Sequence, residues 1–432
     1  VVLDDRMRVR CWGYNSHGQL GQGLGDEDSI GDDEHPSAVA DVDLGLGLGL
    51  GLDEDRCIAE LAAGEEFTCA LIASECGGGC RPEHCDRTAV RCWGDNERGQ
   101  LGIGDSSGDK VAIGDQAGEM PPADTAVLGP SEQGKVVQIA AGDHHVCARL
   151  DKGQVRCWGE NSNGRLGIGD NQGDRMALGD QPGEMPPPDV ALGSTSADVV
   201  VGECHTCARS TSSEVRCWGE GELGQLGYRN GETIGDEDSE MPPGDNGVRG
   251  SAGQSISAMT TGRLHTCVLM AGGEVVRCWG AGYIGGTLGH GSLANYGNEA
   301  VHEMPPRDTP VLHETDTVHI GELTAGTDHT CATLDSGVVR CWGHNSRGQL
   351  GIDLSNNQDI GDDPGEMPPQ SIVFSDDRRV IDLALGFVHS CAVLDNGRVR
   401  CWGGNTNGQL GYADTVDRRT PGPDVDYLPG GP

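Results

Sequence analysis

Cysteines recur at regular spacing in this sequence. The tripeptide Cys-Trp-Gly occurs seven times, and the later copies are 60 to 65 residues apart. Six copies follow an earlier cysteine, which stands ten or eleven residues upstream in five cases and 23 residues upstream in one. The copies begin at Cys11, Cys92, Cys157, Cys217, Cys278, Cys341 and Cys401. Thiols at such spacing can form disulfides or bind a metal ion.

The residues between the paired cysteines favour disulfides. In "HVCARLDKGQVRCWG" the turn Asp151-Lys152-Gly153 joins two short strands, and a three-residue turn with glycine last is typical of a hairpin. Cys147 and Cys157 are equally far from Lys152, so they face each other across the hairpin. Two ligands per repeat cannot build a four-ligand zinc site. We expect the pairs Cys69–Cys92, Cys147–Cys157, Cys207–Cys217, Cys267–Cys278, Cys331–Cys341 and Cys391–Cys401.

Six further cysteines have no partner that the sequence identifies. Three of them lie in an insertion at residues 72–90, which replaces the hairpin turn between Cys69 and Cys92. His84 lies beside them, but the spacing is poor for zinc, so a disulfide-pinned loop is favoured and zinc is the alternative. The pairing of Cys11, Cys57, Cys76, Cys80, Cys85 and Cys204 cannot be deduced from sequence.

Carboxylates gather in a loop after the "GQLG"-like segment of every repeat except the last. The loop repeats as "IGDDEHP", "IGDQAGEMPP", "LGDQPGEMPP", "IGDEDSEMPP" and "IGDDPGEMPP". Oxygen-rich, mobile loops are the chemistry that Ca²⁺ accepts, although no twelve-residue calcium loop is present. The alternative is a plain turn in which Asp bonds its own backbone. Ca²⁺ is the one cofactor considered, with candidate ligands Asp32, Asp33, Asp115, Glu119, Asp180, Glu184, Asp236, Glu240, Asp362 and Glu366.

A histidine stands two residues before the hairpin cysteine in five repeats, and Phe67 takes its place in a sixth. Equivalent positions in a circular repeat protein form a ring, so the histidines could bind a metal. The favoured interpretation is structural, with each histidine bonded to the backbone of a neighbouring repeat. The residues are His145, His205, His265, His329 and His389.

Composition excludes several classes of function. The net charge of −38 excludes a generic nucleic-acid binder, which needs a positive face. No apolar run is long enough to span a membrane. The motifs GxSxG, HExxH and GxxxxGK[ST] are absent, so we do not expect an enzyme. Eighteen cysteines indicate an oxidising compartment, hence an extracellular or cell-surface protein.

The elements that must position these residues are short strands. Each repeat has an apolar run such as "VVQIA", the two strands of the hairpin, and a weaker fourth strand such as "DTAVLG" or "DVALG". The 71 glycines favour tight turns over long helices. Four strands in each of seven repeats predict an all-β fold, a single seven-bladed β-propeller over residues 1–432 with one disulfide per blade hairpin.

The repeats also resemble a known family. "CWGxNxxGQLG", preceded by "GxxHTCAxL", is similar to the repeats of the regulator of chromosome condensation family, and the resemblance covers almost the whole chain. One copy, "CWGAGYIGGTLG", departs from the pattern. The resemblance implies a seven-bladed propeller, and family members include a nucleotide-exchange factor, a secreted inhibitor of β-lactamases and an ultraviolet sensor. This chain is acidic and cysteine-rich where a chromatin binder should be basic. One tryptophan per blade favours packing over light sensing.

The two ends of the sequence correspond to one blade whose first half is missing. By alignment, the residue before Val1 would be the cysteine that pairs with Cys11. The chain is then a fragment, or a neighbouring subunit supplies the missing strands, or the gap is tolerated. We expect a non-enzymatic protein-binding or structural scaffold. The alternatives are a filament subunit whose open blade a neighbouring chain completes, and an exchange-factor or inhibitor activity implied by the resemblance.

Overall fold

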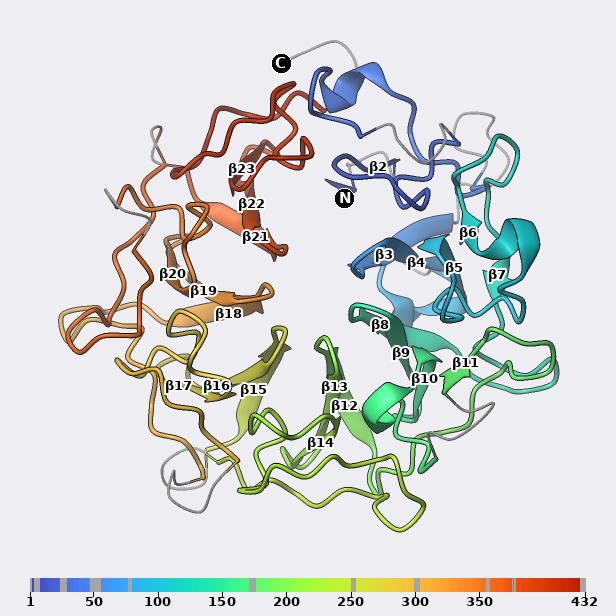
Figure 1. The fold of residues 1–432 in the computed structure, drawn as a ribbon, viewed down its shortest axis with the longest axis horizontal. Helices are drawn as coiled ribbons and strands as arrows, with labels where there is room; N and C mark the ends of the chain where they lie inside the picture. The colour runs from blue at the N-terminus through green and yellow to red at the C-terminus, as the bar shows by residue number, and fades with distance from the viewer. Residues whose placement is uncertain are drawn as a thin grey trace.

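The protein forms a ring of small antiparallel sheets round a central axis (Figure 1). A computed structural model describes residues 2–3, 8–23, 29–46, 56–76, 80–170, 176–249, 254–298, 304–354, 358–374, 376 and 378–427. Among these residues, six sheets have three to five strands and a seventh has two. The arrangement confirms the all-β propeller. The cysteine expected before Val1 lies outside the described residues.

Each blade is built from an inner strand, a middle strand and a third strand that carries Cys-Trp-Gly. The inner strands are β3 (Arg56–Ala63), β8 (Val136–Ala141), β12 (Ser196–Val201), β15 (Ile256–Thr261), β18 (Ile320–Ala325) and β21 (Val380–Leu385). The middle strands are β4 (Phe67–Cys76), β9 (His145–Leu150), β13 (His205–Ser210), β16 (His265–Met270), β19 (His329–Leu334) and β22 (His389–Leu394). The third strands are β5 (Cys85–Asp95), β10 (Val155–Glu160), β14 (Val215–Gly219), β17 (Val276–Gly280), β20 (Val339–Gly343) and β23 (Val399–Gly403).

The remaining elements are short. The two-stranded sheet contains β1 (Val2–Leu3) and β2 (Val9–Arg10), and outer strands are β6 (Ala112–Ile113), β7 (Asp124–Thr125) and β11 (Ala177–Leu178). Four single 3₁₀ turns are η1 (Pro36–Ala38), η2 (Pro82–His84), η3 (Gly108–Lys110) and η4 (Ser162–Gly164). No helix among the described residues is long and apolar enough to cross a membrane.

The hairpin register brings the predicted cysteines together. Cys147 lies directly opposite Cys157, and the same register recurs in the other five hairpins. All six predicted pairs form disulfides, which confirms one disulfide in each of these blade hairpins. Cys57–Cys80 ties the insertion to β3 and Cys76–Cys85 closes within it, so all three of its cysteines are in disulfides. Cys11 and Cys204 are free thiols.

The outer strand differs from its predicted position. We expected it only in segments such as "DTAVLG", whereas it is split into two pieces on either side of the acidic loop. Leu178 pairs with Gly159 at one end of β10, and Asp189 forms a bridge with Arg156 nearer the other end. In two blades both pieces are single bridges, as with Gly343 to Ile360 and Arg340 to Ser371. The loop between the pieces prevents a continuous fourth strand.

The tryptophans join each blade to the one before it. Each indole Nε1–H donates to a backbone carbonyl of the preceding "GQL"-type turn at 2.9–3.0 Å. Trp158 donates to Gln100, and Trp12 donates to Gln409, which links the last turn to the first. Except for Trp12, these side chains are fully buried. The single tryptophan per blade therefore serves packing between blades.

We expect Trp158→Phe to destabilise the fold more than Trp218→Phe. Among the described residues, Gln100 O accepts only from Trp158, whereas Arg165 O also accepts from Thr206 Oγ1 at 3.0 Å. Both changes leave a similar void, but only Trp158→Phe leaves a buried carbonyl without a donor, which costs about 1–3 kcal/mol. Urea unfolding of the two variants measures the difference. Equal losses of stability would show that the indole hydrogen bond contributes nothing.

Candidate protein-docking site at the mouth of the propeller

Six equivalent loops surround one end of the central axis. Each joins an inner strand to a middle strand, and we name them the mouth loops: residues 64–66, 142–144, 202–204, 262–264, 326–328 and 386–388. Each begins with glycine because neighbouring loops touch. A Cβ on Gly142 would lie 2.2 Å from Gly202 O, and a Cβ on Gly262 would lie 2.5 Å from Gly326 O. The glycines therefore bring the variable residues that follow them into one ring.

An acidic arc occupies three neighbouring mouth loops. Glu65, Asp143 and Glu203 are its carboxylates, and burial raises the pKa of Asp143 to about 6, with the charges of Glu203 and Glu65 adding to the effect. Burial also raises the pKa of Glu203 above its ordinary value. A raised carboxyl pKa means that the ionised, negatively charged form is poorly solvated at this site. A cationic group placed at the arc would relieve that cost.

Two arginines border the arc. Arg263 Nε lies 2.9 Å from Glu203 Oε2, and Arg165 Nη1 lies 3.1 Å from Glu160 Oε2. Arg165 also donates to Glu203 O at 3.2 Å and lies 3.5 Å from Cys204 Sγ. These contacts hold the backbone of the 202–204 loop in place.

Cys204 is a free thiol on the same loop. Burial raises its pKa to about 12 despite the nearby Arg165. The thiol is therefore protonated at neutral pH, and a protonated thiol is a poor nucleophile. Cys204 does not give the mouth a catalytic group.

The opposite part of the mouth is apolar. Phe387 is 63% exposed, and Val388 follows it in the same loop. An exposed aromatic side chain beside charged groups is typical of a protein-binding surface. The mouth loops thus combine an acidic arc with an apolar contact.

The acidic loops predicted as calcium sites are organised by their own backbone. Glu119 Oε2 accepts from Gly114 N and Gln116 N at 2.9 and 3.0 Å, and Glu184, Glu240 and Glu366 make the same bonds in their loops. These bonds are those of a turn. Each glutamate lies beside the loop's aspartate, and Asp115, Asp180 and Asp362 each have a buried Oδ1 without a partner. Asp32 and Asp33 lie close to Glu34. Calcium binding stays a prediction.

Four of the five histidines bond to hydroxyl groups of the next blade, not to its backbone as expected. His145 Nε2 lies 3.0 Å from Thr206 Oγ1, and His205, His265 and His329 make equivalent contacts with Thr266, Thr330 and Ser390. Thr206 itself donates to Arg165 O, so it accepts the Nε2–H of His145. The histidines are therefore structural groups between blades.

The sequence predicted the cysteines of the framework but not the mouth. No motif marks residues 65, 143 and 203, because they are the variable positions of "GxxH". One signal was available in the sequence. The repeats keep the glycine and the histidine but vary the two residues between them, and variable positions of this kind are expected to be exposed.

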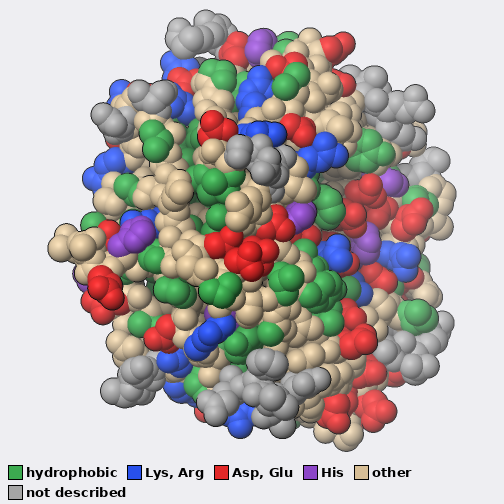
Figure 2. All heavy atoms as spheres, turned by 60° about the vertical axis from the view of Figure 1, so that its left-hand side comes forward, with side chains coloured by type: hydrophobic (Ala, Val, Ile, Leu, Met, Phe, Trp, Pro, Cys, Tyr) green, Lys and Arg blue, Asp and Glu red, His purple; other side chains and the backbone are tan. Residues whose placement is uncertain are grey.

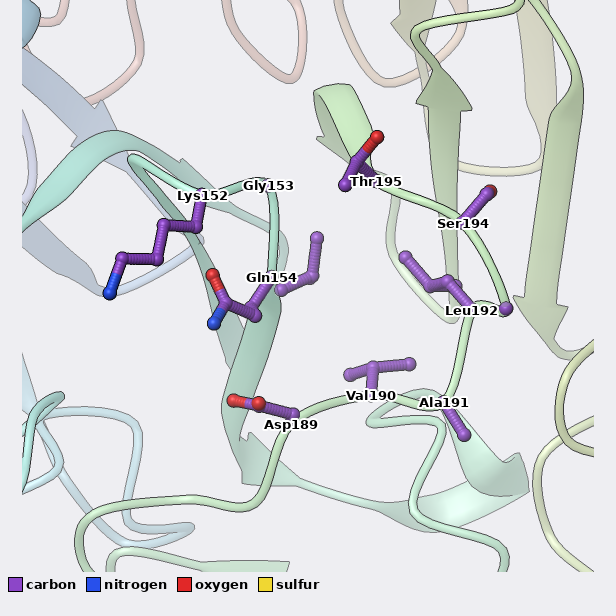
Figure 3. Close-up of a pocket in the computed structure, with 11 residues that line it drawn as sticks. Lys152, Gly153, Gln154, Asp189, Val190, Ala191, Leu192, Ser194 and Thr195 are labelled. Carbon is purple, nitrogen blue, oxygen red and sulfur yellow. The ribbon is translucent and has the colours of Figure 1, made fainter. Parts of the chain in front are cut away.

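One surface pocket lies away from the mouth. Its volume is about 250 Å³, and it lies between the turn at Lys152 and Gly153 and the segment 189–195. Figure 3 shows Lys152 pointing away from the segment that ends in Thr195. Asp189, on its wall, is already paired with Arg156 at 2.6 Å. The pocket is a shallow space beside a hairpin turn and offers few groups to a ligand.

The outer surface is mixed in charge with an acidic excess. Figure 2 shows a group of acidic side chains near the middle of the face in view, with lysines and arginines scattered round it. This distribution agrees with the net charge of −38.

Comparisons with known proteins agree with the fold. A family model described as an RCC1-like domain matches residues 1–426. The Arabidopsis thaliana ultraviolet-B receptor UVR8 is 30% identical over 332 residues, which cover 77% of this chain and 64% of the receptor. The Homo sapiens E3 ubiquitin-protein ligase HERC2 is 27% identical over 386 residues, 78% of this chain and 7% of the ligase. The chain thus spans less than two thirds of either relative.

Solved structures of similar shape support the same fold. Human WBSCR16 superposes with a TM-score of 0.68 at 20% identity, covering 98% of this chain and 95% of that one. Yeast RCC1 (Prp20), solved bound to Kap60, superposes with a TM-score of 0.68 at 22% identity, covering 96% and 85%. At these identities the likeness shows the fold alone.

Proposed function

The chain belongs to the RCC1-like family of β-propellers, and from this premise we propose that it is a non-enzymatic scaffold that binds a basic partner protein at its mouth loops. The observation that carries the proposal is the acidic arc of Glu65, Asp143 and Glu203. The raised pKa values of Asp143 and Glu203 favour a cation that takes the place of solvent. Phe387, on the opposite part of the mouth, supplies an exposed apolar contact.

The proposed place of action is an oxidising compartment, outside the cell or at its surface. Eight disulfides support it, because structural disulfides persist where thiols are not kept reduced. A protein in that setting meets no cytosolic small GTPase. The family's exchange-factor activity and an inhibitor activity are therefore the weaker alternatives.

A charge-neutralising variant tests the proposed site. We expect Glu65→Gln/Asp143→Asn/Glu203→Gln to bind a fluorescein-labelled (Arg-Ser)₅ peptide about tenfold more weakly at low salt, as measured by anisotropy. The matched control is Glu314→Gln/Asp335→Asn/Asp353→Asn, which changes the net charge equally at exposed acids away from the mouth. If the peptide bound only through the general surface charge, its affinity would fall equally in both variants. Equal weakening of binding would therefore contradict a site at the mouth.

A further inference from the structure

The insertion in the β4–β5 hairpin contains two disulfides that lie beside each other. β4 has ten residues, whereas the middle strands of the other blades have six, so this hairpin is longer than the rest. Cys76, at the end of β4, is bonded to Cys85 of β5, and Cys57 of β3 is bonded to Cys80. Cys57 Sγ lies 4.0 Å from Cys76 Sγ. Sulfurs of two different disulfides are therefore almost in van der Waals contact.

These two disulfides are more accessible than those of the blade hairpins. Eleven of the twelve hairpin cysteines are buried, with 0–1% of their surface exposed. In the insertion, Cys57, Cys76 and Cys80 are only partly buried, and Cys85 is fully buried. A thiolate that attacks a disulfide needs access to one of its sulfurs. A thiol in solution can therefore reach the insertion while the hairpin disulfides stay protected.

The next blade holds the extended hairpin in place. Lys135, just before β8, donates from Nζ to Glu83 O at 2.9 Å and also to Cys85 O. Thr88 Oγ1 on β5 accepts from Val136 N at 2.9 Å. These bonds do not involve the sulfurs, so the hairpin should keep its position when one of the two disulfides opens. The Lys135 ammonium also lies near Cys85, where a positive charge stabilises a thiolate.

We propose that the insertion is a thiol-capture site, in which exchange between its two disulfides retains an incoming thiol on Cys80. The ligand is an exposed thiol, either of a small molecule or of a cysteine in a partner protein. The insertion replaces the turn between a middle and a third strand, which lies at the end of the blade opposite the mouth loops. The proposal therefore does not depend on the proposed function.

The capture takes two exchange steps and needs no reactant besides the thiol. In the first step the incoming thiolate attacks Cys80 Sγ, which lies in a bend outside the strands. A mixed disulfide forms on Cys80, the Cys57–Cys80 bond breaks, and its electron pair stays on Cys57. In the second step the Cys57 thiolate attacks Cys76 Sγ, 4.0 Å away. The Cys57–Cys76 bond forms, the Cys76–Cys85 bond breaks, and the Cys85 thiolate takes a proton from solvent.

The second step prevents reversal of the first. Without it, the Cys57 thiolate would attack Cys80 again and expel the incoming thiol, because these two cysteines lie within bonding reach. After it, Cys57 is held in a disulfide, and the remaining thiol is that of the fully buried Cys85. Burial favours the protonated thiol, which is a poor nucleophile. The captured thiol therefore stays on Cys80.

Glutathione is the probe for this site. The unreduced full chain is incubated with a small excess of reduced glutathione at about pH 8 without denaturant, so that part of the thiol is ionised. Free thiols are then alkylated, and fragmentation mass spectrometry locates both modifications. Besides alkylated Cys11 and Cys204, which are free from the start, we expect glutathione on Cys80 and alkylation of Cys85. Alkylation of Cys57 in place of Cys85 overturns the proposal, as does absence of glutathione from Cys80, and neither result needs a variant.

A double variant separates capture from mere access. In Cys76→Ala/Cys85→Ala the Cys57–Cys80 disulfide remains, but Cys57 has no second disulfide to attack, so glutathione on Cys80 should fall at least about tenfold. The control Cys204→Ala, which removes a thiol outside the insertion, should leave capture unchanged. Equal capture by the double variant and the unmodified chain would rule out exchange between the disulfides.

A second probe distinguishes the two sources of the thiol. A soluble peptide with one cysteine replaces glutathione in the same measurement. Attachment of the peptide to Cys80 with alkylation of Cys85 supports capture of a partner's cysteine, and attachment of glutathione alone supports capture of small thiols. Attachment of neither overturns the proposal.

Discussion

Reduction of the disulfides is expected to unfold the protein at neutral pH without denaturant. Each hairpin disulfide with a sequence separation of ten or eleven closes a short loop in the unfolded chain. Closure of a loop of this size contributes about 2.5–3 kcal/mol in the chain-entropy model. The hairpin loops do not overlap, so their contributions should add, to roughly 15 kcal/mol for all six. That equals the upper end of the stability of an ordinary domain, about 5–15 kcal/mol.

Tryptophan fluorescence measures the outcome, because six of the seven indoles are fully buried. Treatment with dithiothreitol should shift their emission to that of the urea-unfolded chain. Removal of one hairpin disulfide by Cys147→Ala/Cys157→Ala should lower the free energy of unfolding by about 3 kcal/mol. The matched control is Cys204→Ala, which removes a free thiol and should change stability little. A reduced and alkylated chain that keeps buried tryptophans would contradict the expectation.

Local chemistry made the hairpins predictable from sequence. The turn at Asp151-Lys152-Gly153 sets which residues lie opposite each other, and Gly153 takes φ +84° as such a turn requires. Once the register was fixed, the pairing of Cys147 with Cys157 followed. The pairing of Cys57 with Cys80 did not, because no turn of known geometry relates an inner strand to the insertion.

Contacts between blades were harder to predict, although two of them left signals. An arginine precedes every Cys-Trp-Gly, and Arg156 donates to Val127 O and Asp189 Oδ1, which fixes the connection from the preceding blade. Likewise "HT" or "HS" in four repeats contains the hydroxyl that accepts from the previous histidine. The arginine is 29 and 33 residues from its two partners and each histidine is 61 to 65 residues from its hydroxyl, and spacing alone does not say which blade face each residue occupies. The mouth loops could be identified only from the structure, which shows that these loops lie together in one ring.

The second large effect is a loss of stability in mild acid. His145, His205, His265 and His329 are fully buried between blades, and burial lowers their pKa values, to about 3 for His205 and His329 and about 4 for His265. In the unfolded chain the same groups titrate near 6.5. Below that pH the unfolded state binds more protons, so stability falls as pH drops from about 6.5 toward 4. At pH 5 His205, His265 and His329 together cost about 6 kcal/mol, and His145 acts in the same direction.

Two buried carboxylates act in the opposite direction. Burial raises the pKa of Glu60 to about 7 and that of Asp143 to about 6. A raised carboxyl pKa favours the folded state as pH falls through it, so these groups gain about 4 kcal/mol between pH 7 and pH 5. Burial also raises the pKa values of Glu203, Glu322 and Asp328 and lowers those of His290 and His389, so each side has further members. We expect the histidines to outweigh the carboxylates, with a net loss of stability at pH 5. The histidines also have the less tolerant geometry, since a proton on Nδ1 of His145, His205 or His329 would find no partner in the structure.

Unfolding by urea between pH 7.5 and pH 4.5 separates the histidines from general acid effects. Phe67 shows that the position accepts an aromatic ring that cannot titrate, so His265→Phe should fold. The slope of its unfolding free energy against pH should be smaller by the contribution of one proton, about 1.4 kcal/mol per pH unit. His313→Phe, at an exposed histidine, should keep the dependence of the unmodified chain. If His265→Phe also kept the dependence of the unmodified chain, the buried histidine would not contribute to the loss of stability in acid.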